Sequence, residues 1–179
     1  MNVLVLCLGN ICRSPLAASM LEAYVKNNFP ESAPQISFYS AGTYSHTKGQ
    51  KADSRSIEVA VKNENIVPGV SSILSLHRAR PVTIADITLC DYILVMDLSN
   101  LAKVRAIIEK NSSDQNTVNA LMKKVFLFGN FCKENFHDNE EDHIIIKDPW
   151  YGSSSDFDTV YHQCHLATKR FISYLRLGQ

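Results

Sequence analysis

Short apolar runs alternate with amphipathic segments along this chain. Residues 2–7 (NVLVLC) form a continuous run rich in Val and Leu, which is typical of a strand buried on both faces of a parallel sheet. Similar runs at 36–40, 91–96 and 124–128 predict three further strands. Apolar residues at helical spacing predict helices from 14 to about 28, and over 52–65, 98–110 and 157–177. The polar segment 111–119 and the acidic segment 138–142 are predicted to be surface loops.

Strands that alternate with helices indicate an α/β fold with a parallel sheet. No repeat, linker or low-complexity segment interrupts the pattern, so we expect one domain over 1–179. Ligands of such sheets bind beyond the carboxyl ends of the strands. Cys7, Ser40 and Asp97 lie at or just past predicted strand ends, and functional residues are expected there.

Composition narrows the class of protein. The chain has 179 residues, 45% of them hydrophobic, which suits one domain with a sizeable core. Equal numbers of basic and acidic residues, 18 each, argue against nucleic acid or an anionic membrane as the main partner. No basic-then-apolar leader and no run of roughly 20 apolar residues occurs, so a cytoplasmic protein is expected. The five cysteines lack zinc spacing and are expected to be free thiols.

The segment between Cys7 and Arg13 contains the main candidate chemistry. It joins a buried strand to a helix that opens with Ser14 and Pro15, and it includes Gly9 and Asn10. Such a loop can turn its backbone N–H groups inward, the helix N-terminus adds a partial positive charge, and Arg13 adds a guanidinium fork. These groups predict a cradle for a tetrahedral dianion with the Cys7 sulfur at its floor, where the thiolate form is favoured.

Other details of this loop leave alternatives open. Asn10 is expected to adopt a left-handed conformation that shapes the loop. The Ser14 hydroxyl either bonds to the thiolate or only caps the helix. The plainest interpretation, that Cys7 is a buried strand residue and Arg13 a surface charge, explains none of the neighbouring positions.

A thiolate that attacks a phosphate monoester needs a proton donor for the departing oxygen. The best candidate is Asp148, because Pro149 favours an extended backbone there and Trp150 and Tyr151 can line a slot for an aromatic ring. An Asp-Pro pair alone is more often an ordinary turn. The aromatic neighbours favour a catalytic role instead.

Several motifs occur together over nearly the whole chain: VLCLGNICRSP (5–15), SAGT (40–43), HRAR (77–80), DYILVMDLSN (91–100), DPWYG (148–152) and FDTVYHQC (157–164). In these motifs the sequence resembles a known family, the low-molecular-weight protein tyrosine phosphatases. The resemblance implies a single three-layer domain whose four-stranded parallel sheet is flanked by helices, with a phosphate-binding loop after the first strand. It also implies no metal and no cofactor, and phosphotyrosine-containing proteins as partners.

The resemblance implies a role for each matching residue. Cys7 is the nucleophile, Arg13 the phosphate binder and Asp148 the general acid and base. The residues expected to bind substrate belong to the loop and to an aromatic rim: Leu8, Gly9, Asn10, Ile11, Cys12, Ser14, Tyr44, Trp150 and Tyr151. Ser40, His77 and Asp97 are expected to support the site from behind, and His77 is expected to be structural.

The resemblance also bears on Cys12. It implies that Cys12 forms a reversible disulfide with Cys7 on oxidation, and the alternative is that Cys12 is only a small packing residue. Trp150 stands where the family often has Tyr, and 111–119 and 136–142 look longer than usual. Two other functions fit the sequence less well. Arsenate reduction needs a cysteine relay that Cys90 alone does not supply. Non-catalytic phosphotyrosine binding does not require Cys7, Arg13 and Asp148 together.

Overall fold

The computed structural model describes residues 1–133 and 143–177. Its four strands form one sheet in the order β2-β1-β3-β4, and all neighbours are parallel. The strands are β1 (Asn2–Cys7), β2 (Ser37–Gly42), β3 (Tyr92–Val95) and β4 (Val125–Leu127). The predicted α/β fold class with a four-stranded parallel sheet is therefore confirmed.

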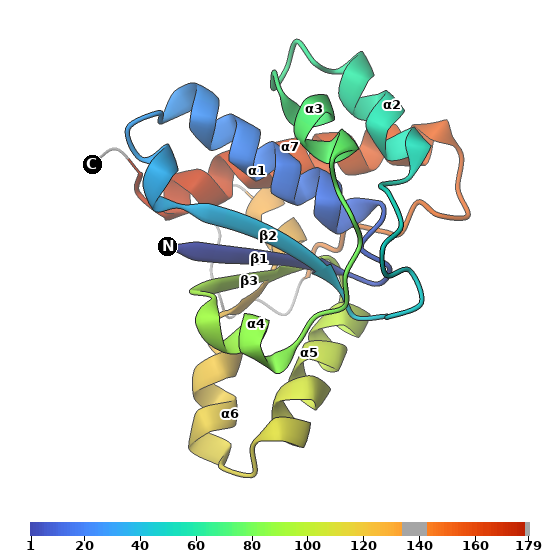
Figure 1. The fold of residues 1–179 in the computed structure, drawn as a ribbon. Coiled ribbons are helices and arrows are strands. Elements are labelled where there is room, and N and C mark those ends of the chain that lie inside the picture. The colour runs from blue at the N-terminus through green and yellow to red at the C-terminus, as the bar shows by residue number, and fades with distance from the viewer. Residues whose placement is uncertain (134–142, 178–179) are drawn as a thin grey trace.

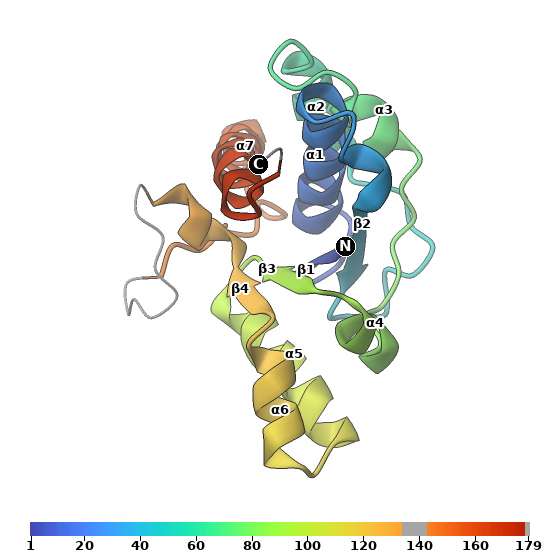
Figure 2. The same ribbon diagram turned by 90° about the vertical axis from the view of Figure 1, so that its left-hand side faces the viewer.

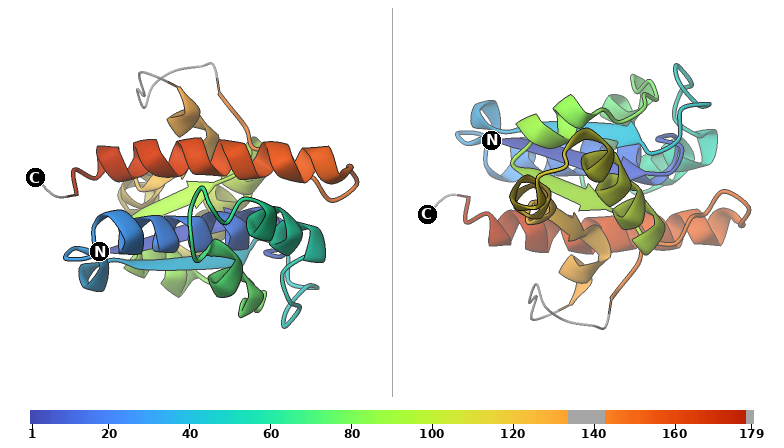
Figure 3. Two further views of the ribbon diagram at one scale, coloured as in Figure 1. Left: turned by 90° about the horizontal axis from the view of Figure 1, so that it is seen from above. Right: turned by 90° about the horizontal axis from the view of Figure 1, so that it is seen from below.

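Helices cover both faces of the sheet (Figures 1 and 2). One face carries α1 (Arg13–Asn28), α2 (Ser54–Lys62), α3 (Val70–Ser75) and α7 (Ser154–Tyr174). The other face carries α4 (Ile84–Leu89), α5 (Leu98–Asn111) and α6 (Gln115–Met122). Two short 3₁₀ helices, η1 (Ala33–Gln35) and η2 (Phe128–Cys132), complete the described elements. Seen from above, α1 and α7 run side by side over the sheet (Figure 3).

The alternation of side chains along β1 explains the three layers. Val3, Val5 and Cys7 join the core under α1 and α7, whereas Leu4 and Leu6 join the core under α4 and α5. Successive strand residues point to opposite faces, and each fully buried Val or Leu contributes about 1.5–3 kcal/mol. A run that is apolar at every position is therefore stable only between two helical layers.

The structure corrects several predicted boundaries. The segment 111–119 is not simply a loop, because α6 begins at Gln115 and is capped by the carboxylate of Asp114. Its apolar residues Val118, Leu121 and Met122 pack on the core under α5. The helices α3 and α4 were not predicted, since six residues are too few to show a periodicity.

Two other boundaries shift for local reasons. The strand β2 extends to Gly42, so Ser40 lies within the strand rather than past its end. The closing helix begins at Ser154, three residues earlier than predicted, because the backbone N–H of Ser153 donates to Asp156 and starts the helix there. The whole of the segment 136–142, including its acidic part 138–142, lies outside the described residues.

Candidate active site

The loop 8–13, called the anion loop here, joins the end of β1 to the start of α1. Asn10 has a φ of 54° and so adopts the left-handed conformation expected of it. This turn aims the backbone N–H of Asn10 at the Cys7 Sγ, 3.2 Å away. The N-cap of α1 is Cys12, whose side chain makes no capping bond. The free N–H groups of the first helical turn therefore remain available to an anion.

Ser14 lies inside α1 and is not its N-cap. Its Oγ lies 3.0 Å from the Cys7 Sγ. Of the two roles considered for this hydroxyl, the structure supports the contact with sulfur.

Asn10 is the centre of a buried network behind the anion loop. Its Nδ2 donates to the Oγ atoms of Ser14 and Ser40, each at 2.9 Å. Its Oδ1 accepts from the backbone N–H of Arg80 at 3.0 Å, and its carbonyl lies 2.7 Å from His77 Nε2. Asn10 and Ser14 are fully buried, so they support the loop from behind rather than line the cleft. His77 likewise contacts the loop and not the sulfur, and burial lowers its pKa.

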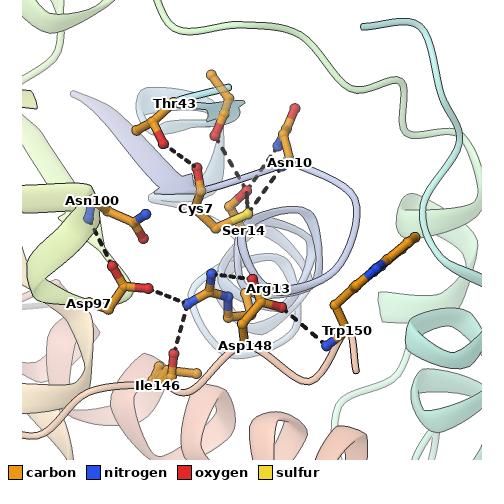
Figure 4. A network of polar contacts seen from close by, with 11 residues as sticks. Cys7, Asn10, Arg13, Ser14, Thr43, Asp97, Asn100, Ile146, Asp148 and Trp150 are labelled. Atoms are coloured by element: carbon orange, nitrogen blue, oxygen red, sulfur yellow. Dashed lines mark hydrogen bonds and ion pairs between the residues drawn. The ribbon is translucent and has the colours of Figure 1, made fainter. Parts of the chain in front are cut away.

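Arg13 holds two carboxylates beside the sulfur (Figure 4). Its Nη1 donates to Asp97 Oδ2 at 2.6 Å and to the Ile146 carbonyl at 3.0 Å. Its Nη2 donates to Asp148 Oδ2 at 2.7 Å. The side chain is only 2% exposed, and burial alone would lower its pKa. The negative charges of Cys7, Asp148 and Asp97 outweigh burial and raise the pKa of Arg13.

Two anchors place Asp148 opposite Arg13. Ile146 is fully buried, and its N–H donates to the Met96 carbonyl at the end of β3, 2.9 Å away. Asp148 follows two residues later with a side chain 40% exposed. Its Oδ1 accepts from the backbone N–H of Trp150 at 3.2 Å. The carboxylate therefore borders both the guanidinium and solvent.

These groups meet in a cleft of about 520 Å³. Its lining consists of Cys7, Leu8, Gly9, Ile11, Cys12, Arg13, Tyr44, Thr47, Gln50, Asp148, Trp150 and Tyr151. Tyr44 stacks on His46 with ring centroids 4.5 Å apart. Tyr151 is 98% exposed and stands at the rim. The cleft thus has the buried residues Cys7 and Arg13 at its floor and exposed aromatic side chains at its rim.

Sequence reasoning missed Thr47 and Gln50. Thr47 Oγ1 donates to the Gly9 carbonyl at 2.6 Å, so it also holds the anion loop. Both residues belong to a polar stretch without periodicity or motif, and no signal in the sequence distinguishes them from solvent-exposed residues. Asp97 was predicted to be supporting, and its direct ion pair with Arg13 emerges only from the structure.

The sequence is similar to a known family model and to known proteins. Residues 2–177 match the family model described as low molecular weight phosphotyrosine protein phosphatase. The chain is 34% identical to the protein of that name from Gallus gallus and 32% identical to that from Homo sapiens, over 96% of this chain and 93% of each relative.

Solved structures are similar as well. A protein tyrosine phosphatase from Entamoeba histolytica, with Hepes in its active site, has a TM-score of 0.75 at 29% identity and covers 99% of this chain and 98% of its own. The tyrosine phosphatase Wzb from Escherichia coli K30, in complex with sulphate, has a TM-score of 0.70 at 29% identity and covers 97% of both chains.

These matches first define the class: the chain is a hydrolase of the protein-tyrosine phosphatase type. It belongs to the low molecular weight phosphotyrosine protein phosphatase family, as its motifs predicted. In the part of the chain that the structure describes, no helix has the length and apolar character that crossing a bilayer requires.

Proposed function

We propose that this protein hydrolyses phosphotyrosine, and small aryl phosphates, through a phosphocysteine intermediate on Cys7. One observation carries the proposal: the Cys7 sulfur, the Arg13 guanidinium and the Asp148 carboxylate border the same cleft. The sulfur accepts the Asn10 N–H of its own loop at 3.2 Å and lies 3.0 Å from the Ser14 hydroxyl, so two hydrogen-bond donors face the proposed nucleophile. Nucleophile, anion binder and proton donor are the three parts that the reaction requires.

Substrate binding rearranges the contacts of Arg13. Its Nε is buried and has no hydrogen-bond partner among residues 1–133 and 143–177, and its Nη2 is bonded to Asp148. A phosphoryl group that uses Nε and Nη2 as a fork competes with Asp148 for Nη2. Asp148 is then released toward the cleft, where its carboxylate takes up a proton from solvent and can reach the phenolic oxygen.

The first chemical step transfers the phosphoryl group to sulfur. The Cys7 thiolate attacks phosphorus in line, the bond between phosphorus and the phenolic oxygen breaks, and Asp148 gives its proton to that oxygen. Arg13 and the N–H groups of the anion loop stabilise the charge on the equatorial oxygens.

The second step returns the sulfur to its starting state. Asp148, now a carboxylate, takes a proton from water as the water attacks the phosphocysteine. The bond between phosphorus and sulfur breaks, and the Ser14 hydroxyl, 3.0 Å from the sulfur, stabilises the departing thiolate. Inorganic phosphate leaves the cradle.

The walls of the cleft support an aromatic substrate. Tyr44, Trp150 and Tyr151 are all exposed and line it, and flat rings pack well against a phenyl phosphate. Phosphotyrosine-containing proteins are therefore the proposed partners. Five free thiols support a reducing, cytoplasmic location.

The test is hydrolysis of 4-nitrophenyl phosphate in EDTA. Cys7→Ser is expected to show no turnover. Asp148→Ala is expected to lose about 10²–10⁴-fold in kcat, because the second step still needs its carboxylate as the base toward water even though 4-nitrophenolate leaves without a proton. Cys90→Ser is the matched control and is expected to keep full activity. A Cys7→Ser enzyme as fast as wild type would end the proposal.

Arsenate reduction is disfavoured by the position of Cys90. The backbone N–H of Asp91 donates to the Asn2 carbonyl, so Cys90 lies level with the amino end of β1. Cys7 is at the carboxyl end of that strand, on the order of 17 Å away at about 3.3 Å per residue. Cys90 therefore cannot exchange a disulfide with Cys7 in this fold.

A further inference from the structure

Arg55, in the first turn of α2, is held in one orientation by its neighbour Asp53. Asp53 caps the helix by accepting the backbone N–H of Arg55 at 2.9 Å. The same carboxylate accepts the Arg55 Nε at 3.0 Å and Nη2 at 2.9 Å. This bidentate pair fixes the plane of the guanidinium and leaves Nη1 free to reach outward.

The outward side of Arg55 contacts the segment that carries the proposed acid. Its Nη1 donates to the Trp150 carbonyl at 3.2 Å, and its Cζ lies 5.6 Å from the centroid of the Trp150 ring. The guanidinium also lies 4.4 Å from the centroid of Phe157 at the start of α7. Trp150 is therefore held at its carbonyl and at its ring by one side chain.

Trp150 in turn holds Asp148, because its backbone N–H donates to Asp148 Oδ1. At the other end, the backbone N–H of Asp53 donates to the Ile11 carbonyl of the anion loop at 2.8 Å. A continuous chain of contacts thus runs from the anion loop through Asp53, Arg55 and Trp150 to Asp148.

These contacts between the anion loop and Asp148 become important when substrate binds. In the structure Asp148 is also bonded directly to Arg13 at 2.7 Å. In the proposed mechanism a phosphoryl group binds the Nη2 of Arg13, so the direct bond between Arg13 and Asp148 is lost. The contacts through Arg55 do not involve Arg13, so they remain when the acid has to point at the leaving oxygen.

We propose that Arg55 is a positioning residue. Through Trp150 it holds Asp148 where the acid can protonate the leaving oxygen. The inference rests on the proposed role of Asp148 as general acid. Arg55 itself touches neither the nucleophile nor the phosphoryl group. Its loss should therefore weaken proton delivery and leave the anion cradle intact.

The test compares kcat/KM for phenyl phosphate and 4-nitrophenyl phosphate, because kcat/KM reports the transition state of the first chemical step. 4-Nitrophenolate leaves readily without a proton, whereas phenolate needs one. Arg55→Met is expected to lose about 10-fold or more on phenyl phosphate, as misplacement of a catalytic group does, and less than about 3-fold on 4-nitrophenyl phosphate. The ratio of the two values does not depend on how much of a sample is folded.

Lys62→Met is the matched control. Lys62 is a cation on the same helix that also contacts α7, but it does so through Asp158 at 2.9 Å and not through Trp150. Its substitution is expected to leave the ratio unchanged. Arg55→Lys keeps the charge without the bidentate pair and gives a second measurement of the ratio if Arg55→Met does not fold.

Asp148→Ala separates this inference from the proposed function. If Asp148→Ala loses activity equally on both substrates, Asp148 is not the general acid and both ideas fail. If Asp148→Ala is selective but Arg55→Met and Arg55→Lys are not, only the role of Arg55 is overturned. The expected result is that Arg55→Met shifts the ratio in the wild-type background and adds no further shift in Asp148→Ala.

Discussion

Replacing Asp97 with alanine removes two interactions through one carboxylate. Its Oδ1 caps α5 by accepting the Asn100 N–H at 2.8 Å, and its Oδ2 is paired with Arg13 at 2.6 Å. Loss of a cap costs about 1 kcal/mol. Removal of one partner of a buried ion pair costs about 3–5 kcal/mol, and because Asp97 is 21% exposed we expect about 2–3 kcal/mol here. The predicted loss in the free energy of unfolding is therefore about 3–4 kcal/mol, measured by urea denaturation.

Two other variants separate the contributions. Asp97→Asn retains one oxygen, which can serve either Asn100 or Arg13 but not both, so about half of the loss is expected. Asp114→Ala removes an exposed cap on α6 that forms no ion pair within residues 1–133 and 143–177, and it should cost about 1 kcal/mol. If Asp97→Ala costs no more than Asp114→Ala, the pair with Arg13 does not stabilise the site as argued.

Three further predictions concern the anion loop. Gly42→Ala places a Cβ 2.8 Å from the Leu8 carbonyl oxygen, so the backbone of the anion loop must shift. We expect kcat/KM for 4-nitrophenyl phosphate to fall by about 10-fold or more. Unchanged kinetics would show that this close contact does not position the loop. Burial lowers the pKa of His77 below 6.5, so the unfolded chain takes up a proton first and stability falls as pH drops through 6.5. The decrease in Tm from pH 7 to 5 should be smaller in His77→Gln. Activity lost to hydrogen peroxide should return with dithiothreitol in wild type but not in Cys12→Ser, and equal recovery would exclude the disulfide.

The sequence alone determined the parts of this protein that depend on short segments. A short apolar run that is rich in Val and ends at a turn indicates a strand buried on both faces, and β1 is one. A Cys at the end of that strand, an Arg at the start of the next helix and Asn10 between them already specified the anion loop, including its left-handed turn. Asp148 could be selected as the candidate acid because its neighbours Pro149 and Trp150 gave it a distinct local context.

Only the tertiary structure decided which distant residues complete the site. Arg13 meets Asp97 across 84 positions of the sequence and Asp148 across 135, and Arg55 meets Trp150 across 95. Nothing in the residues around Arg55 or Thr47 distinguishes them from ordinary surface residues, because their roles come from what the fold brings against them. Helix α6 was mistaken for a loop for the same reason: its few apolar residues indicate a helix only once the core that buries them is known.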